Sequence, residues 1–469
     1  MQKLNGFPII PAQPDAPHLI TPLPGPRSSA LTKRDRRVTS PSYTRDYPLV
    51  VESAIGSVIT DPDGNRFLDM TAGIAVTATG HCHPYVVDAI KRQSEKCLHM
   101  SGTDFYYESQ IQLAERLSVL APMKCKNRIF FTNSGAESVE AALKLARYHT
   151  GRQHVIAFIG AFHGRTYGAM SLGASKMIQS MGFKPLVPQI SHVDYPDPYR
   201  PLGAERNVTD HTINEINLVF KHKVGPNEVA AIFVEAIQGE GGYIVPPDDF
   251  LPRLRELCSK HGIMMVCDEV QSGMGRTGRL WCVEHSNVEP DMVTSAKGIA
   301  SGLPLGALIA PESIMDWKYG SHASTFGGNP VSCAASSATL DLLEAGLLEN
   351  ATSSGEVLLA GLNQIKSEHV CVGDARGRGL MTAIDFVKSR KSRDPDPDTR
   401  NRVVLACFQR GLLLLGCGES AIRFCPALTI TEKQIKTALL ILHDAIREVV
   451  SDTNQEILHE PSNDSKTLA

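Results

Sequence analysis

The sequence has few aromatic residues and almost no excess of charge. Phe, Trp and Tyr make up 6% of the 469 residues, and the formal net charge is -3. Nucleic acids and anionic membranes are held mainly by clustered basic residues, so this balance favours neither as a partner. We expect no membrane-spanning segment, and the start of the chain lacks the charged-then-apolar order of a secretory signal.

Paired cysteine motifs are also missing. The chain has 11 cysteines, an odd number, and none stands in a Cys-x-x-Cys spacing. This pattern argues against a disulfide framework and a cysteine-based zinc site, and it favours reduced thiols. We therefore expect a cytoplasmic protein.

Two short motifs resemble known binding sites, one for a dinucleotide and one for a metal ion. Gly273-Met-Gly275-Arg-Thr-Gly278 matches a dinucleotide-binding pattern, but Asp268 and Glu269 precede it and no convincing long helix follows. Both features are unfavourable for a pyrophosphate, which argues against a nicotinamide cofactor. His81-Cys82-His83 has no companion cluster to complete a metal site, so a turn before Pro84 is the simpler interpretation.

The hydrophobic pattern predicts a large α/β protein. Hydrophobic residues make up 42% of the chain, and short apolar segments alternate with helical patterns. Such alternation is typical of a mainly parallel sheet covered by helices. The expected strands are residues 128–132, 155–159, 230–235, 264–267 and 292–295.

The ends of the chain differ from its middle. Seven prolines and a basic cluster at residues 33–37 predict an extended arm rather than a packed element. Amphipathic helices dominate the last third, which predicts a second, smaller domain built from both chain ends. The expected division is an arm at 1–40, small-domain residues 41–75 and 336–450, a large domain at 76–335, and a polar tail at 451–469.

Lys297 is the most informative residue, because it closes one apolar run and opens a glycine-rich segment. A second predicted strand also ends in charge, at Asp268. Taken singly, each residue is simply explained as a surface charge at the end of a strand. Taken together, they indicate a pyridoxal phosphate site. Lys297 would hold the cofactor as a Schiff base, and Asp268 would keep its pyridine nitrogen protonated.

Other predicted strand ends support this interpretation. The segment at residues 130–137 runs from a predicted strand through a turn of small residues into a predicted helix at residues 138–148, whose first N–H groups can bind phosphate. The same segment is also explained as an ordinary helix cap. Phe162 offers a face for stacking on a heteroaromatic ring, and Arg165 can grip a carboxylate. Alone, Phe162 is simply explained as a core residue, and Arg165 as a surface charge.

Two further charged residues lie in apolar surroundings. Glu235 ends the predicted strand at residues 230–235, at the sheet edge where open α/β sheets bind ligands; its simpler explanation is a turn carboxylate. Arg423 lies within Ile422-Arg423-Phe-Cys-Pro426, where an unpaired charge would be costly. Arg423 therefore needs an anion, either structural or from a substrate.

Considered jointly, these segments resemble the class III, fold-type I aminotransferases over roughly residues 45–445. The resemblance implies a mainly parallel seven-stranded large domain, a smaller α+β domain and a homodimer, possibly a dimer of dimers. It is carried by Asn133-Ser-Gly-Ala-Glu137, Phe162-His-Gly-Arg-Thr166, Glu235-Ala-Ile-Gln-Gly-Glu240, Asp268-Glu-Val-Gln271, Ala296-Lys-Gly298 and Thr325-Phe-Gly-Gly-Asn329.

The resemblance also implies residue roles. Gln271 would bind the phenolic oxygen of pyridoxal phosphate, Val270 would lie behind its ring, and His163 would belong to the cofactor site. Gly135 and Ala136 would give backbone N–H groups to the phosphate, and Thr325 would reach the same phosphate from the neighbouring subunit. For the substrate, Arg165 would hold the distal carboxylate and Arg423 the α-carboxylate of glutamate, with Glu235 pairing with Arg423 when no α-carboxylate is present.

The pattern is most similar to 4-aminobutyrate aminotransferases, which implies ping-pong transfer from an ω-amino acid to 2-oxoglutarate. Ile74 fits that substrate, because ornithine-type members tend to have a tyrosine there; its simpler explanation is core packing. Ornithine, N-acetylornithine and lysine stay open as donors. A pyridoxal phosphate-dependent racemase is the main alternative, and a non-catalytic relative has no support in these residues.

Overall fold

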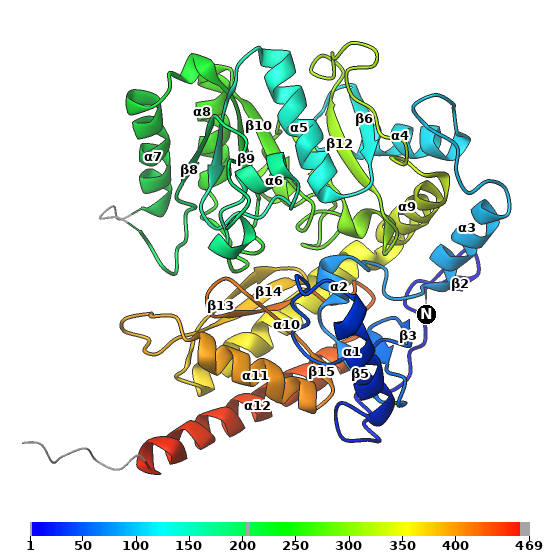
Figure 1. Cartoon of the computed structure of the whole chain (residues 1–469), viewed down its shortest axis with the longest axis vertical. Coiled ribbons are helices and arrows are strands. Elements are labelled where there is room, and N and C mark those ends of the chain that lie inside the picture. The colour runs from blue at the N-terminus through cyan, green and yellow to red at the C-terminus, as the bar shows by residue number, and fades with distance from the viewer. Residues whose placement is uncertain (1, 203–206, 460–469) are drawn as a thin grey trace, which may run out of the picture.

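The computed structural model describes residues 2–202 and 207–459, with side chains described up to residue 451. The described chain forms two lobes, a large one around a broad sheet and a smaller one built from both chain ends (Figure 1). The hydrophobic core is largely continuous, since buried residues of both lobes belong to one cluster.

A seven-stranded sheet forms the centre of the large lobe, as far as the described residues show. The strands from β11 to β8 pair in parallel, whereas β12 is antiparallel to both of its neighbours. The predicted mainly parallel, seven-stranded sheet is therefore confirmed. In spatial order its strands are β6 (Asn127–Thr132), β12 (Gly306–Pro311), β11 (Met292–Ser295), β10 (Met264–Asp268), β9 (Val229–Val234), β7 (His154–Phe158) and β8 (Ile190–Val193).

The burial of the strands explains why they form a covered parallel sheet. All six residues of β9 are buried, as expected for a strand with both faces packed against helices. α5 begins at a serine cap and ends at Gly151, whose φ of +66° permits a left-handed C-cap. The helices of this lobe include α3 (Pro84–Ser94), α4 (Glu108–Leu120), α5 (Gly135–Thr150), α6 (Tyr167–Leu172), α7 (Val208–His222) and α8 (Phe250–His261).

The small lobe joins the two ends of the chain through β-pairing. β15 (Leu412–Leu413) pairs in parallel with β5 (Arg66–Asp69), so residues far apart in sequence share one sheet. That sheet continues through β4 (Val58–Thr60) to β3 (Ser53–Ile55). A second sheet contains β13 (Val372–Arg378), β14 (Met381–Phe386), β17 (Ala421–Phe424) and β16 (Leu415–Cys417), and α11 (Pro397–Gln409) and α12 (Glu432–His459) complete the lobe.

The structure differs from the predicted arm and the predicted tail at the two ends of the chain. The basic cluster expected in an extended arm lies in α1 (Pro26–Val38), a helix that starts with a proline in its first turn, where proline is tolerated. A short hairpin of β1 (Lys3–Leu4) and β2 (Phe7–Pro8) precedes it. Helix α12 extends through the first nine residues of the predicted tail, and residues 460–469 lie outside the described part.

The predicted domain boundary at residue 335 falls inside a helix. α9 (Pro330–Leu342) packs against α3 and α4 and continues through a π-helical turn, Leu343–Leu347, into α10 (Leu348–Glu368). Helix α10 packs instead against β13, β14 and α12. Gly346 has a φ of +147° and forms the kink, so the change of lobe occurs at this turn.

The same helical stretch is the one candidate membrane span among the described residues. Pro330–Glu368 is long and apolar enough by composition, which the sequence analysis did not expect. However, 56% of its most apolar window is buried inside the protein, and the stretch is broken at Gly346. It is therefore explained as core packing between the two lobes.

A short helix, α2 (Ala72–Ala75), follows β5. Gly73 and Ile74 within it have positive φ angles of 62° and 67°. A positive φ is strained for a branched residue such as isoleucine, which marks this turn as a conformation held by its surroundings.

Candidate active site

A cavity of about 430 Å³ lies at the carboxyl ends of the central strands. Lys297 follows β11, Asp268 ends β10 and Glu235 follows β9, so parallel pairing brings the three strand ends together. Ten of the predicted site residues line the cavity: Gly135, Ala136, Phe162, His163, Arg165, Glu235, Asp268, Val270, Gln271 and Lys297. The loop at residues 302–305 also lines it and was not singled out from the sequence.

Lys297 is held in an unusual backbone and electrostatic state. Its φ is +45°, a left-handed conformation that is uncommon for residues other than glycine. Burial lowers the pKa of its ammonium group, although the charges of Asp268, Glu240 and Glu235 partly oppose that shift. A lowered pKa increases the fraction of neutral amine, the form that acts as a nucleophile and base.

The carboxylate of Asp268 is fixed by three donors. His163 Nδ1 lies 2.6 Å from Oδ2, while Thr294 Oγ1 and the backbone N–H of Val270 donate to Oδ1 at 3.1 and 3.0 Å. Burial alone would lower the pKa of His163, but the hydrogen bond and charge of Asp268, together with the charge of Glu235, raise it overall. His163 is therefore a positioning partner of Asp268, a geometry that the sequence motif did not reveal.

The start of α5 forms a cradle with room for a phosphate group. Ser134 caps the helix by accepting from Glu137 N at 3.3 Å, so the first N–H groups, at Gly135 and Ala136, have no partner inside the helix. A Cβ atom at position 135 would lie 2.7 Å from Val270 Cγ1. Only glycine allows this approach.

These features fit pyridoxal phosphate. The cavity combines a lysine amine, a fixed carboxylate and a helix N-terminus, which match the aldehyde, the pyridine nitrogen and the phosphate of that molecule. In addition, the buried Nε2 atom of His163 has no hydrogen-bond partner within the described residues. A buried polar atom without a partner at a cavity is a group that a ligand or water can satisfy.

Arg423 has a different partner from the one predicted. Its guanidinium is buried and its Nη1 donates to Glu240 Oε1, whereas Glu235 makes no ion pair with it. Glu235 instead accepts from the backbone N–H groups of Phe162 and Gly239, at 3.3 and 3.1 Å. The pairing of Glu235 with Arg423, predicted for a bound substrate without an α-carboxylate, is not formed in this structure and stays a prediction.

The physical reason lies in the turn that follows β9. Glu235 stays at the strand end and is tied to the backbone of the large lobe, while Glu240 lies on the turn. The carbonyl of Glu240 accepts from Gly418 N at 2.8 Å, near β17, which carries Arg423. Burial alone would raise the pKa of Glu240, but the charge and hydrogen bond of Arg423 lower it.

Glu235 has a strongly perturbed carboxyl group. Burial raises its pKa to about 7, with a further increase from the charge of Asp268, against the opposing charge of His163. A carboxyl group with such a pKa can exchange a proton near neutral pH. Glu235 thus differs in protonation from the ion-paired Glu240.

Gln271 is oriented by a tyrosine that sequence reasoning missed. Tyr243 Oη donates to Gln271 Oε1 at 2.7 Å, and both side chains are buried. The carbonyl of Tyr243 in turn accepts from Arg376 Nε at 3.2 Å. Tyr243 lies on the turn after β9 and Arg376 on β13, so the small lobe supports the wall of the cavity.

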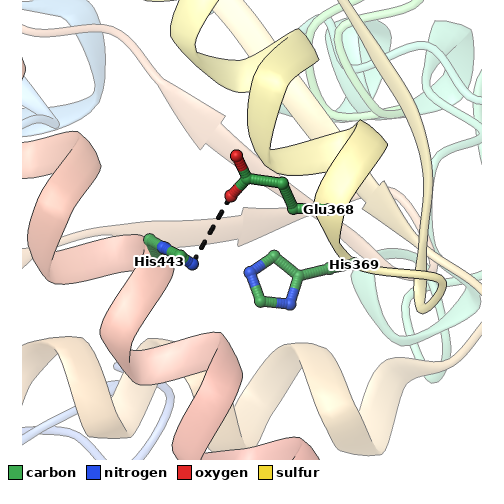
Figure 2. Close-up of side chains that lie close together, drawn as sticks. All are labelled: Glu368, His369 and His443. Carbon is green, nitrogen blue, oxygen red and sulfur yellow. Dashed lines mark ion pairs between the residues drawn. The ribbon is translucent and has the colours of Figure 1, made fainter.

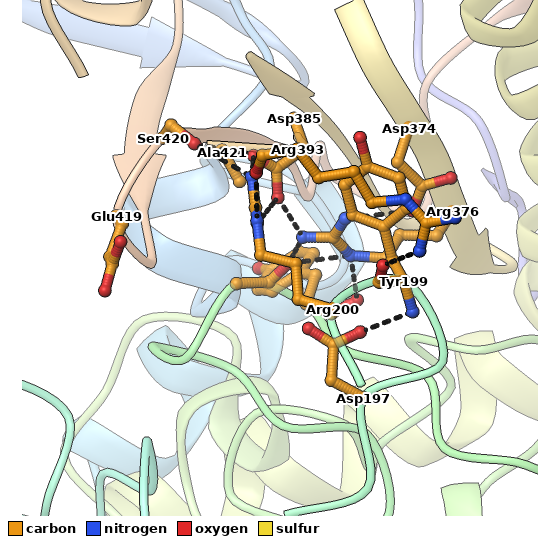
Figure 3. A network of polar contacts seen from close by, with 12 residues as sticks. Asp197, Tyr199, Arg200, Asp374, Arg376, Asp385, Arg393, Glu419, Ser420 and Ala421 are labelled. Carbon is orange, nitrogen blue, oxygen red and sulfur yellow. Dashed lines mark hydrogen bonds and ion pairs between the residues drawn. The ribbon is translucent and has the colours of Figure 1, made fainter. Parts of the chain in front are cut away.

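Arg376 belongs to a network that joins the two lobes. Asp385 on β14 accepts from both terminal nitrogens of Arg200, at 2.8 and 2.9 Å, and from Arg376 Nη2 at 2.9 Å. Figure 3 shows Arg200 reaching from the loop after β8 toward Asp385, with Ser420 beside it. Ser420 Oγ adds a fourth bond to the same carboxylate, at 2.7 Å.

The remaining predicted residues have different positions. The Arg165 guanidinium lies 5.6 Å from the centre of the Phe162 ring, at the cavity wall. Ile74 is 38% exposed and Thr325 is also exposed, and neither lines the cavity. A substrate role for Ile74 and a cofactor role for Thr325 stay predictions.

The glycine pattern at residues 273–278 is a turn and not a nucleotide site. Arg276 within it is buried and donates to the carbonyls of Leu380 and Pro426. The next helical segment is a 3-10 turn, Cys282–Ser286, which provides no long helix dipole for a pyrophosphate. The nicotinamide alternative therefore has no structural support.

Comparison with known proteins agrees with this geometry. The sequence profile of the class-III aminotransferase family matches residues 39–446. An alanine/serine racemase from Pyrococcus horikoshii is 37% identical over 93% of this chain and 94% of its own length. A 4-aminobutyrate aminotransferase from Mycobacterium bovis is 39% identical over 90% of this chain and 96% of its own. A PLP-bound amine transaminase from an uncultivated Pseudomonas species has a TM-score of 0.82 and 32% identity, covering 88% of this chain and 98% of that chain.

Proposed function

The chain belongs to the class-III aminotransferases and uses pyridoxal 5'-phosphate, and from this premise we propose that it transfers the amino group of an ω-amino acid to 2-oxoglutarate. The leading donor is 4-aminobutyrate, and the products are a semialdehyde and glutamate. The observation that carries this proposal is the ion pair of the buried Arg423 with the partly buried Glu240, whose charges both act on Lys297.

The cofactor, when bound, supplies an electron-accepting ring. The residues of this chain bind the cofactor and move the proton. Asp268, held by His163, would pair with the ring nitrogen, and the N–H groups of Gly135 and Ala136 would hold the phosphate. Lys297 Nζ takes the proton from the substrate carbon that bears the amine, which its lowered pKa favours.

The two half-reactions require one pocket for two differently shaped substrates. We propose that Arg165 holds the carboxylate distal to the reacting carbon in both. With 4-aminobutyrate bound, which has no α-carboxylate, Glu240 neutralises Arg423. With glutamate bound, the α-carboxylate replaces Glu240 on Arg423, as expected for a buried cation that needs one anion at a time.

The complete site is proposed to require a homodimer. Thr325 is exposed and does not line the cavity of its own chain, which suits a residue that reaches the phosphate in a neighbouring subunit. The thiols of all 11 cysteines are free, in keeping with a cytoplasmic location. Sedimentation of the holoenzyme tests the dimer.

A panel of amines tests the substrate proposal. The purified holoenzyme is incubated with 2-oxoglutarate and each of 4-aminobutyrate, β-alanine, ornithine, N-acetylornithine and lysine, and glutamate is measured. We expect the highest kcat/KM with 4-aminobutyrate. Glutamate formation from none of these donors would overturn the ω-amino acid proposal.

Racemisation is the second candidate, because a racemase covers 93% of this chain at 37% identity. A racemase returns the proton to the same substrate carbon and needs no keto acid. The second cation at Arg165 favours transfer, since a dicarboxylate acceptor has two charges to hold. Inversion of an amino acid without any keto acid would decide for racemisation.

A further inference from the structure

A cluster of two histidines and one glutamate lies on the small lobe, away from the cavity. Glu368 ends α10 and His369 caps it, while His443 comes from α12 (Figure 2). One ligand atom of each residue lies within 4.8 Å of the other two. The pyridoxal phosphate cavity uses none of these residues.

The geometry of this cluster is close to that of a metal site. His443 Nε2 lies 3.5 Å from Glu368 Oε2. Two ligands each about 2.0–2.2 Å from a tetrahedral zinc ion lie roughly 3.4 Å apart, so this pair has nearly the separation that an ion would impose. His369 offers a ring nitrogen within 4.8 Å of the ligand atoms of both other residues, and its ring centre lies 4.8 Å from that of His443.

A second observation concerns His369 Nε2. This nitrogen is buried and has no hydrogen-bond partner among the described residues. Buried polar atoms are normally satisfied by protein, water or an ion. Figure 2 shows the imidazole of His369 beside the line that joins Glu368 and His443.

We propose that Glu368, His369 and His443 bind a divalent cation of the zinc class. Two imidazole nitrogens and one carboxylate are a donor set typical of such ions, and one coordination position would stay open to water. The side chains of His443 and Glu368 are 33% and 41% exposed, so the ion can exchange with solvent. The bound ion would join the end of α10 to α12 and stabilise the small lobe.

Two arginines lie close to the Glu368, His369 and His443 cluster, and each has a hydrogen-bond or ion-pair partner outside these three side chains. Arg447 lies in the same helix as His443 and pairs with Asp444 at 3.6 Å. Arg390 donates to the carbonyl of His369 at 2.9 Å.

Calorimetric titration of the metal-free holoenzyme with zinc tests the site. We expect one equivalent to bind and to raise Tm. The affinity for zinc should fall at least about 10-fold in His443→Ala and in Glu368→Gln, because even the loss of a residue that only supports a metal ligand costs about 10–100-fold. The rise in Tm on adding zinc should also be smaller in both variants. His222→Ala, at an exposed histidine of α7, is the matched control and should bind as the wild type does.

Thiol binding is the main competing explanation, because Cys82 and Cys125 are exposed. A Cys82→Ser/Cys125→Ser variant should keep the equivalent of zinc. The proposal is wrong if no zinc binds, if binding disappears only in the cysteine variant, or if His443→Ala and Glu368→Gln both bind as tightly as the wild type. The metal-free Tm of each variant shows whether it folds, and His369→Asn replaces either variant that does not.

Discussion

Arg423, which is buried, forms an ion pair with the partly buried Glu240 and not with Glu235, the acid that directly follows β9. The two acids have separate environments. Glu235 is tied to two backbone N–H groups, whereas Glu240 lies on the turn and is held by Arg423 and by one backbone bond. An acid on a turn can leave its partner without disturbing the sheet, which makes Glu240 the better candidate for an exchangeable anion.

Glu240→Gln should change which substrates the enzyme prefers. Without the carboxylate, Arg423 stays uncompensated when 4-aminobutyrate binds, but it still meets its partner when glutamate binds. A charge-assisted hydrogen bond contributes about 1.5–3 kcal/mol, so kcat/KM for 4-aminobutyrate should fall roughly 10- to 100-fold relative to that for glutamate. The ratio of the two kcat/KM values measures the effect.

Glu235→Gln is the matched control for this experiment. It removes a buried carboxyl group five positions away without touching the ion pair, so the substrate ratio should stay within a few-fold of the wild-type value. An equal change of the ratio in both variants would mean that the two acids share the role.

Lys297→Ala should lose both the covalent attachment of the cofactor and the proton transfer. The visible absorbance of the attached cofactor should disappear. The value of kcat should fall by about 10²-fold or more, because a general base usually contributes about 10²–10⁴-fold. Lys318→Ala, a lysine outside the cavity, should keep the spectrum. A spectrum that is unchanged in Lys297→Ala would show that another lysine is used.

The residues at strand ends could be predicted from the sequence because a parallel sheet brings them to one edge. Lys297, Asp268 and Glu235 each follow a recognisable apolar strand. The partner of Arg423 could not be predicted, since two acids lie in one short motif and only the path of the turn selects Glu240. Arg376 and Tyr243 were missed for another reason: their contact spans 133 positions and joins different lobes, so no local pattern reports it.

The helix at Pro26–Val38 was not predicted, because the six prolines that precede it are typical of an extended segment. Pro26 stands in the first turn, where a missing N–H costs nothing, and the following residues have no helix breaker. The flanking prolines belong to the extended segment before it. The first 40 residues therefore contain two kinds of structure, a proline-rich segment and a helix, which one overall composition does not distinguish.

Stability should depend on the protonation of Glu235. Its pKa is raised from 4.5 to about 7, so between these values the folded protein keeps a proton that the unfolded chain releases. Folding then binds a proton, and the associated stability is fully present below the lower value and is lost as the pH rises through the higher one. The loss is on the order of 3 kcal/mol.

Glu235→Gln removes this dependence and keeps the size of the side chain. Its Tm relative to that of the wild type should rise between about pH 5 and about pH 8, since only the wild type loses stability in that window. Glu269, whose pKa burial also raises to about 7, is present in both proteins and cancels. A constant difference across this range would contradict the assignment.

Breaking the network between the lobes should cost far more than breaking a surface ion pair. Asp385→Asn leaves Arg200 and Arg376 around a neutral side chain, and the Arg376 side chain is only 12% exposed. Loss of one partner in a buried network costs about 3–5 kcal/mol. Because Arg376 also holds the Tyr243 carbonyl, and Tyr243 orients Gln271, the affinity for the cofactor should fall as well.

Arg378→Ala is the control at the surface. It breaks the ion pair with Asp248, whose side chain is 90% exposed, and should lower the free energy of unfolding by no more than about 1 kcal/mol. Thermal unfolding and cofactor titration of both variants separate the two cases, and equal losses would show that the network adds nothing to an ordinary surface contact.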